Sequence, residues 1–531
     1  MSQYRVLVLD GVSPRGVEVL AGVQGVEVIQ SKSLSEDELV QKIPDFDALV
    51  VRSQTKVTKK ALEAAKKLKV VGRAGVGVDN VDVPTATQKG IVVMNTPGGN
   101  TISTAEHAFS LLLSMARSIP QAHATMKAGK WDRKSFEGVE INNKVLGIIG
   151  MGRIGTEVCR RAMAFGMKVL AYDPYLSLGK ARSLQVELYE KLDEMLPHCD
   201  FITLHIPMSA ETKGILNERT LKLCKKGVRI VNCARGGLVE EKALHEALLS
   251  GQVAGAALDV YEKEPPAAEF PLRDVPTLVM TPHLGASTAE AQESVGIEVA
   301  EAIRDLLLTG TIRNAVNMPN VDSKTLELLR PYLELGEKLG RILAQLAPTR
   351  CEMLTVNYSG KITEFDTTAI SRAVVKGFLK LAIGPDVNDV NAPFYAENLG
   401  LKYSETRLSQ AGEYSEMLTA QVSTGSGEVF EVSGTIFGVA PRLVSINKHY
   451  LEARPEGVLL VMENTDRPGI VGWVGTLLGK HKVNIASMSL SRSAPGSKAL
   501  SVLNLDSMPS PAVIQELTKD PDITSVKFIQ V

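Results

Sequence analysis

Short apolar runs alternate with longer amphipathic stretches along about the first 280 residues of this chain. The runs have the length of strands, and the stretches between them, such as residues 35–43 and 59–67, have helical periodicity. Strands that alternate with helices form parallel sheets covered on both faces. The runs lie at residues 6–9, 26–29, 48–51, 70–71, 91–94, 145–150, 168–172, 201–205, 228–232, 254–259 and 277–280. We therefore expect two successive doubly wound, Rossmann-like α/β units, ending near Pro97 and Pro282.

Two helical patterns lie outside this alternation. One runs from residue 102 to about 128 and should break or bend near Pro120. The other covers residues 289–308 and has the length of an element that crosses back onto the first unit.

The remainder of the chain has a different pattern after a linker at residues 314–322. A helix expected at 325–346 is followed by alternating runs and two helical segments, which predicts an α+β unit. The last 75 or so residues give the order β-α-β-β-α-β of a ferredoxin-like domain.

Composition excludes several classes of protein. The chain has 531 residues, enough for several domains, with 59 basic and 60 acidic side chains and a net charge of −1. This balance offers no basic surface for nucleic acid or for an anionic membrane. We expect no targeting segment before the first strand at Arg5. The five cysteines contain no C-x-x-C pair, which favours a reducing, cytoplasmic compartment. They are Cys159, Cys199, Cys224, Cys233 and Cys351.

A G-x-G-x-x-G motif, formed by Gly150, Gly152 and Gly155, directly follows the strand expected at 145–150. It opens a helix that should run to about residue 165. Glycines permit the tight turn, and the helix N-terminus offers free N–H groups to a pyrophosphate. Asp173 ends the next strand, where a carboxylate accepts ribose hydroxyls and repels a 2′-phosphate. The pattern predicts a dinucleotide site that prefers NAD over NADP.

Three residues of different chemistry follow strands of the same unit: Arg235, Glu264 and His283. Ligand and catalytic groups gather at the carboxyl ends of strands in open α/β sheets. A carboxylate bonded to an imidazole orients the ring and favours proton uptake by it. A guanidinium group can hold a substrate carboxylate at two points. Together the three residues predict a hydride-transfer site.

Arginines also end two strands of the first unit, at Arg52 and Arg73. Two guanidinium groups at one rim suit a substrate that carries phosphate as well as carboxylate. The remaining histidines have no metal-ligand spacing, and no P-loop or nucleophile elbow is present, so we expect chemistry without a metal. We assign His107, His123, His198 and His245 to ordinary helix or surface positions, and His205 to the edge of the cofactor site.

These motifs resemble the D-isomer-specific 2-hydroxyacid dehydrogenases, above all at residues 150–155, 232–237, 259–266 and 282–287. Residues 73–82 and 94–97 are similar to the members of that family that oxidise 3-phospho-D-glycerate to 3-phosphooxypyruvate in L-serine biosynthesis. The long form of those members carries an intervening domain and a C-terminal ACT domain, so the resemblance covers the whole chain. It implies a substrate domain at 1–98 and 285–315, an NAD domain at 99–284, an intervening domain at 316–454 and an ACT domain at 455–531.

The resemblance also implies a role for each matched residue. His283 would be the acid/base, Glu264 its partner and Arg235 the anchor of the substrate carboxylate. Val76 and Ile206 stand where relatives often have threonine. The implied cofactor positions are Val76, Gly150, Gly152, Arg153, Ile154, Gly155, Asp173, Ile206, Cys233, Ala234, Asp259, Gly285 and Ala286. The implied substrate positions are Arg52, Ser53, Arg73 and Asn100, with Arg133 reaching the site of a neighbouring subunit.

At the C-terminal end, Asp466 and Asn484 match positions that hold L-serine between paired ACT domains in serine-inhibited relatives. The resemblance thus implies regulation by serine and a homodimer or homotetramer. An ACT domain that only assists assembly is the alternative.

Other readings of the catalytic part remain open. D-glycerate and 2-hydroxyglutarate are alternative substrates. The paired arginines disfavour D-glycerate, whereas 2-hydroxyglutarate remains a side substrate. A regulatory protein that senses NAD on a retired dehydrogenase fold is the alternative from another class; the presence of Arg235, Glu264 and His283 opposes it.

Overall fold

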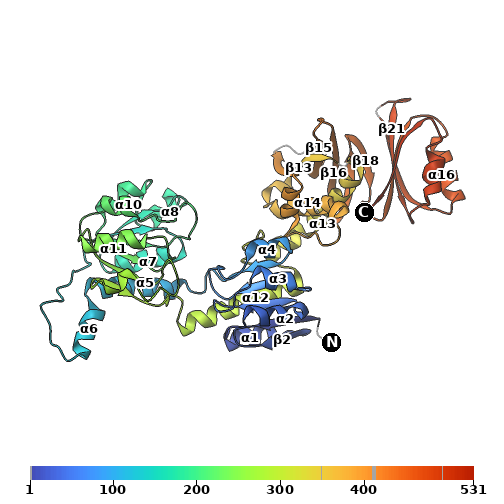
Figure 1. The fold of residues 1–531 in the computed structure, drawn as a ribbon. Helices are drawn as coiled ribbons and strands as arrows, with labels where there is room; N and C mark the ends of the chain where they lie inside the picture. The colour runs from blue at the N-terminus through green and yellow to red at the C-terminus, as the bar shows by residue number, and fades with distance from the viewer. Residues whose placement is uncertain (1–2, 349, 409–413, 493) are drawn as a thin grey trace.

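The computed structural model describes residues 3–348, 350–408, 414–492 and 494–531. Figure 1 shows an elongated molecule in which four sheet-centred units follow one another. The second unit along the chain lies at one end, the first unit lies in the middle, and the third and fourth units lie at the other end (Figure 1). The predicted boundaries between these domains stay predictions.

The first unit has a parallel five-stranded sheet in the order β2-β1-β3-β4-β5, with apolar cores on both faces. Buried β-branched side chains fill the strands, as expected of a sheet covered on both faces. Its strands are β1 (Tyr4–Val8), β2 (Val26–Gln30), β3 (Ala48–Val51), β4 (Val70–Arg73) and β5 (Val92–Met94). Its helices are α1 (Pro14–Ala21), α2 (Glu36–Lys42), α3 (Lys59–Ala64) and α4 (Val83–Gln88).

Helix α12 (Ala289–Thr309) returns to this sheet, which confirms the predicted crossing. The helix packs closely onto the sheet at Gly72 of β4, where a side chain would collide with Val299 and Ile303 of α12. The chain therefore passes twice between the first and second units, once before α5 and once before α12. The two connections contact each other, since the Thr104 hydroxyl donates to the carbonyl of Gly285 (3.1 Å).

The second unit has a parallel seven-stranded sheet in the order β12-β11-β10-β9-β6-β7-β8. Its strands are β6 (Val145–Ile149), β7 (Lys168–Tyr172), β8 (Glu187–Tyr189), β9 (Phe201–Leu204), β10 (Val228–Asn232), β11 (Val253–Leu258) and β12 (Leu278–Met280). Its helices are α5 (Thr101–Ala116), α6 (Ile119–Lys127), α7 (Arg153–Ala164), α8 (Leu178–Ser183), α9 (Leu192–Met195), α10 (Glu218–Leu223) and α11 (Glu241–Leu249). The helix break expected near Pro120 falls at Ser118, whose φ of 48° is left-handed.

The third unit is α+β, as predicted, with a six-stranded sheet in the order β14-β13-β15-β16-β17-β18. Its strands are β13 (Cys351–Gly360), β14 (Lys402–Leu408), β15 (Glu416–Thr424), β16 (Val429–Phe437), β17 (Ala440–Ile446) and β18 (His449–Ala453). Its helices are α13 (Ser323–Leu346), α14 (Thr368–Ile383) and α15 (Ala392–Asn398).

The fourth unit has the predicted order β-α-β-β-α-β and an antiparallel sheet in the order β20-β21-β19-β22. Its elements are β19 (Val458–Thr465), α16 (Ile470–Lys480), β20 (Ile485–Arg492), β21 (Lys498–Leu505), α17 (Pro511–Leu517) and β22 (Ile523–Gln530). One face of this sheet is continuous with the third unit's core, through Leu459, Val502 and Ile529. No helix in the described part of the chain is long and apolar enough to cross a membrane. The cytoplasmic location stays a prediction.

Candidate active site

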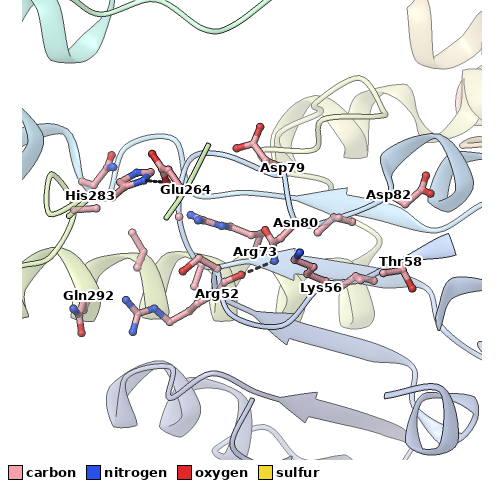
Figure 2. Close-up of a pocket in the computed structure, with 18 of the residues that line it drawn as sticks. Arg52, Lys56, Thr58, Arg73, Asp79, Asn80, Asp82, Glu264, His283 and Gln292 are labelled. Atoms are coloured by element: carbon pink, nitrogen blue, oxygen red, sulfur yellow. Dashed lines mark hydrogen bonds and ion pairs between the residues drawn. The ribbon is translucent and has the colours of Figure 1, made fainter. Parts of the chain in front are cut away.

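A cavity of about 1100 Å³ lies where the strand ends of the first unit face the second unit. Figure 2 shows its lining, with His283 and Glu264 on one side and Arg52 and Arg73 on the other. Residues far apart in sequence meet here. The predicted site residues that line it are Arg52, Ser53, Arg73, Asn100, Glu264, His283 and Ala286.

The imidazole of His283 and the carboxylate of Glu264 are hydrogen-bonded, with 2.7 Å between Nδ1 and Oε2. The other oxygen of Glu264 accepts the backbone N–H of Tyr261 (3.1 Å), which fixes the carboxylate. Because Nδ1 is bonded to Glu264, Nε2 is the ring atom left to face the cavity. The pair is half exposed, so a substrate can reach it.

Asp259 holds the turn that carries His283. Its carboxylate is buried and accepts the N–H groups of Leu284 (2.7 Å) and Gly285 (2.8 Å), while its carbonyl accepts the N–H of His283 (3.0 Å). Burial acts to raise the pKa of Asp259, but these bonds and those from His107 and Thr281 outweigh it and lower that pKa. The carboxylate thus stays charged, and its bonds fix the acid/base turn, whose φ at His283 is 57°.

The cavity has an excess of positive charge. Burial, and then the nearby charges of Arg235 and Arg52, lower the pKa of Arg73 to about 10. The acid nearest to Arg235 is Asp79, at 3.8 Å, and its side chain is 84% exposed. Guanidinium groups that repel each other, with only an exposed carboxylate 3.8 Å from one of them, form a site for an anion.

Two buried polar atoms in the cavity lining have no hydrogen-bond partner: Nε of Arg73 and Oδ1 of Asn100. Buried polar atoms are nearly always paired, so an unpaired atom beside a cavity indicates where a ligand binds.

Arg235 is held by a turn that the sequence did not reveal. The side chain of Asn232 accepts the N–H of Ala234 (3.0 Å) and donates to the carbonyl of Arg235 (2.9 Å). A side chain on Gly236 would collide with the carbonyl of Tyr261, so only glycine fits after Arg235. Asn232 is thus a supporting residue of the site. Asn232 begins the 232–237 motif, but the motif did not indicate this role, since the role depends on backbone groups that the turn brings close.

The glycine-rich loop fits a dinucleotide. Gly150 has a φ of 94°, and a side chain on Gly155 would collide with the carbonyl of Gly150. Gly152 caps α7 with open space around it, and no side chain occupies the helix N-terminus there. The free N–H groups of that N-terminus are the donors that a pyrophosphate requires. Asp173 accepts the N–H of Met151 (2.8 Å) and of Tyr175 (2.8 Å), which ties the loop to the end of β7.

The other predicted cofactor positions lie on several elements. Arg153 begins α7 and Ile206 packs against Gly150, while Cys233 is buried, which raises the pKa of its thiol. Val76 accepts a bond from Asn95 (2.6 Å). His205 is buried as well, and burial lowers the pKa of its ring to about 4, so it stays neutral. Ile154 lies on α7, Ala234 in the loop after β10, and Gly285 and Ala286 in the loop after β12.

Arg235 is not among the residues that line the cavity, and three further predicted residues lie well away from it. Arg133 is exposed in the segment after α6, which Figure 1 shows projecting from the second unit. Asp466 accepts bonds from Arg492 (2.5 Å) and Gly496 (3.3 Å), and Asn484 donates to Asp506 (2.8 Å).

Comparisons with known proteins define the class first. The family model described as "D-isomer specific 2-hydroxyacid dehydrogenase, NAD binding domain" matches residues 109–285, so the second unit is an NAD-binding domain of this dehydrogenase class. A glyoxylate reductase from Paecilomyes thermophila is 31% identical, with a TM-score of 0.54 over 59% of this chain and 98% of its own. An NAD-dependent formate dehydrogenase from Staphylococcus aureus in complex with NAD is 29% identical, with a TM-score of 0.51 over 58% of this chain and 97% of its own.

Matches that extend along the full length of the chain identify the particular family. Models of the "D-3-phosphoglycerate dehydrogenase intervening domain" and of the ACT domain match residues 328–447 and 458–522. D-3-phosphoglycerate dehydrogenase of Archaeoglobus fulgidus is 41% identical over 99% of this chain and all of that protein. The Bacillus subtilis protein of that name is 41% identical over 99% of both chains. The chain belongs to the D-3-phosphoglycerate dehydrogenase family.

Proposed function

We propose that this protein oxidises 3-phospho-D-glycerate to 3-phosphooxypyruvate with NAD, the first step of the phosphorylated pathway to L-serine. The observation that carries the proposal is the cavity lined by Arg52, Arg73 and the His283–Glu264 pair, with the charge of Arg235 close enough to Arg73 to help lower its pKa. A substrate with a phosphate and a carboxylate supplies the negative charge that these guanidinium groups lack. D-glycerate has only the carboxylate and leaves part of that charge unmatched. The names of the full-length relatives support the same substrate.

In the proposed reaction, NAD held at the glycine-rich loop and Asp173 would supply the acceptor for the hydride of C2. His283 takes the proton of the C2 hydroxyl, and Glu264 stabilises the imidazolium that results. Arg235 holds the carboxylate, while Arg52 and Arg73 bind the phosphate in a fork geometry that a guanidinium matches. In the reverse direction His283 returns the proton to the carbonyl oxygen.

The test is oxidation of NADH in the presence of 3-phosphooxypyruvate, with NADPH as the control cofactor. We expect turnover with NADH and little with NADPH. Glyoxylate, hydroxypyruvate and 2-oxoglutarate serve as competing substrates, and 2-oxoglutarate should give at most a side activity. A higher kcat/KM for any of these than for 3-phosphooxypyruvate would contradict the proposal.

Asp173→Ala should lower the preference for NAD over NADP by about 10- to 100-fold, because the repulsion of the 2′-phosphate is lost. The variant also loses the bonds to Met151 and Tyr175, so KM should rise for both cofactors. The measurement is the ratio of kcat/KM for NAD to that for NADP. The matched control is Asp193→Ala on α9, and an unchanged ratio in Asp173→Ala would remove Asp173 from the ribose contact.

We propose further that L-serine binds between the ACT domains of two chains. Arg492, the partner of Asp466, pairs with Ala499 on β21, whereas Ile485, beside Asn484, pairs with Leu505. Strands rise by about 3.3 Å per residue, so Asp466 and Asn484 lie roughly 20 Å apart in one chain. One serine molecule is too small to bridge them. A second chain, related by a two-fold axis, would bring Asp466 of one ACT domain to Asn484 of the other.

Serine inhibition should therefore show complementation between variants. Asp466→Ala and Asn484→Ala should each raise the serine concentration for half inhibition at least about tenfold, by the loss of a hydrogen bond to a charged group. In mixed assemblies, each interface keeps one intact site, so sensitivity should partly return. The measurement is the inhibition curve of each variant and of the mixture refolded or exchanged together. A mixture as insensitive to serine as its components would contradict a shared site. A wild-type protein that serine does not inhibit would favour the alternative in which the ACT domain only assists assembly.

We propose a homodimer or homotetramer, with the arm after α5 as one contact. Helix α6 has no buried residue, and Ile119, Met126 and Trp131 are exposed on this projecting arm. Exposed apolar side chains grouped on one segment favour a protein interface. Arg133, two residues after Trp131, would then reach the neighbouring subunit.

A further inference from the structure

His107 lies on α5, the helix that begins at the first crossing between the two catalytic units, and its ring points to the turn behind His283. Its Nε2 is 3.1 Å from Oδ1 of Asp259 and 3.2 Å from Oγ1 of Thr281. The side chain of His107 is 20% exposed and that of Asp259 is 1% exposed. The contact is therefore an interior one. The Thr281 hydroxyl donates its hydrogen to Asp259, so it accepts from His107, and Nε2 carries the hydrogen that points toward Thr281 and Asp259.

Asp259 needs such a donor. A buried carboxylate without a partner is strongly unfavourable, and each hydrogen-bond donor beside it offsets part of that cost. Its other partners are neutral: the hydroxyl of Thr281 (2.6 Å) and two backbone N–H groups. Cys233, which faces Asp259, is a thiol whose pKa the buried carboxylate helps to raise. In the described part of the chain, His107 and Thr281 are the side chains that place a donor beside the carboxylate of Asp259.

The hydrogen-bond partners of Asp259 connect its position to that of His283, the proposed acid/base. Its carboxylate holds Leu284 and Gly285, on the C-terminal side of His283, and Thr281, on the N-terminal side. Tyr261 holds the same turn from another direction, through a bond to the carbonyl of Thr281 (2.9 Å). Any shift of the Asp259 carboxylate therefore shifts the backbone of His283 relative to the substrate. A displacement of about 1 Å at a reacting group can lower a rate about 100-fold.

We infer that His107 is a positioning residue: through Asp259 and Thr281 it holds the 281–285 turn so that His283 meets the C2 hydroxyl. The inference rests on the proposed function for the identity of the reaction. His107 does not line the cavity, so it acts through Asp259 and Thr281.

The choice of substituents gives a sharp test. The amide nitrogen of glutamine reaches as far along the side chain as Nε2 of histidine, whereas that of asparagine reaches only as far as Nδ1. Because Nε2 is the donor, His107→Gln should retain kcat within about threefold of wild type. His107→Asn and His107→Leu should both lower kcat by about 10- to 100-fold. KM for 3-phosphooxypyruvate should stay within about twofold, since the arginines are unchanged. The matched control is His245→Leu on α11, a helical histidine outside the cavity.

A second readout does not depend on catalysis. The N–H groups of Leu284 and Gly285 donate to Asp259, so their hydrogen exchange reports directly on the turn. Exchange at these two amides should be faster in the Asn and Leu variants and near wild type in the Gln variant.

The outcomes separate this inference from the proposed function. Equal kcat in all variants, or an equal loss in Gln, Asn and Leu together with a lower Tm, would overturn the positioning role. A wild type without dehydrogenase activity would refute the proposed function instead. In that case unaltered exchange at Leu284 and Gly285 in the Asn and Leu variants would still overturn the inference, and faster exchange would support it.

Discussion

His283→Ala should lower kcat by about 10²–10⁴-fold, the usual contribution of a positioned general acid/base. Without the imidazole, water is left to take the hydroxyl proton, and Glu264 loses its partner at 2.7 Å. The loss should appear in kcat rather than in KM, because the arginines that bind the anionic groups are intact. The measurements are steady-state kinetics in both directions and the Kd for NADH by fluorescence titration.

The control for this prediction is His198→Ala, at an exposed position in the same unit. Glu264→Gln should give an intermediate loss, since the amide still bonds to the ring but no longer stabilises its positive charge. Full activity in His283→Ala would remove His283 from the acid/base role.

Arg73→Met should have opposite effects on activity and on stability. Its loss removes a fork that binds phosphate, so KM for 3-phosphooxypyruvate should rise about 100-fold, the scale of one or two hydrogen bonds between charged groups. The same change should raise Tm by several degrees, because burial and the neighbouring Arg235 and Arg52 make the charged form of Arg73 unfavourable in the folded protein. Methionine keeps the length of the apolar stem.

The pH dependence of this gain follows from the direction of the shift. The folded protein lowers the pKa of Arg73 to about 10, below its ordinary value, so folding is disfavoured at every pH below about 10. The cost is relieved only as the pH rises through 10, and the Tm gain of Arg73→Met should therefore be constant between pH 6 and 9. The measurement is thermal unfolding over that range, with and without sulfate.

Sulfate distinguishes this explanation from a general change in packing. It should stabilise wild type more than Arg73→Met, since an anion in the cavity offsets the repulsion. Arg182→Met, at an exposed position on α8, is the matched control. A variant that is less stable than wild type at all pH values, with or without sulfate, would contradict the electrostatic account.

The parallel units and the ferredoxin-like unit could be predicted because their buried strands are apolar and periodic. Three strands were missed because they lack that signal. In β14 every side chain is exposed, β8 has only three residues, and only Leu451 and Ala453 are buried among the five residues of β18. The shared core of the third and fourth units also gave no signal, since apolar residues such as Leu459 and Ile529 do not reveal which surface covers them.

Some residues of the candidate site could likewise be predicted from the sequence, and others could not. Glycines, arginines and histidines at strand ends indicated Gly150, Arg235 and His283, because topology alone brings strand ends together. His107 was assigned an ordinary helical role, since its contact with Thr281 spans 174 residues of sequence and depends on how α5 packs. Predicting it would have required the packing of the whole unit.

The double passage of the chain between the first two units limits how they can move. A single connection permits rotation about any axis, but two that touch, as at Thr104 and Gly285, permit opening and closing about the one line that runs through both. Gly99 packs tightly against Val295 beside this line. Points near the line travel least, and His283 lies only two residues before Gly285. The acid/base can thus keep its alignment while the distant rims of the two units swing apart to admit and release the nucleotide.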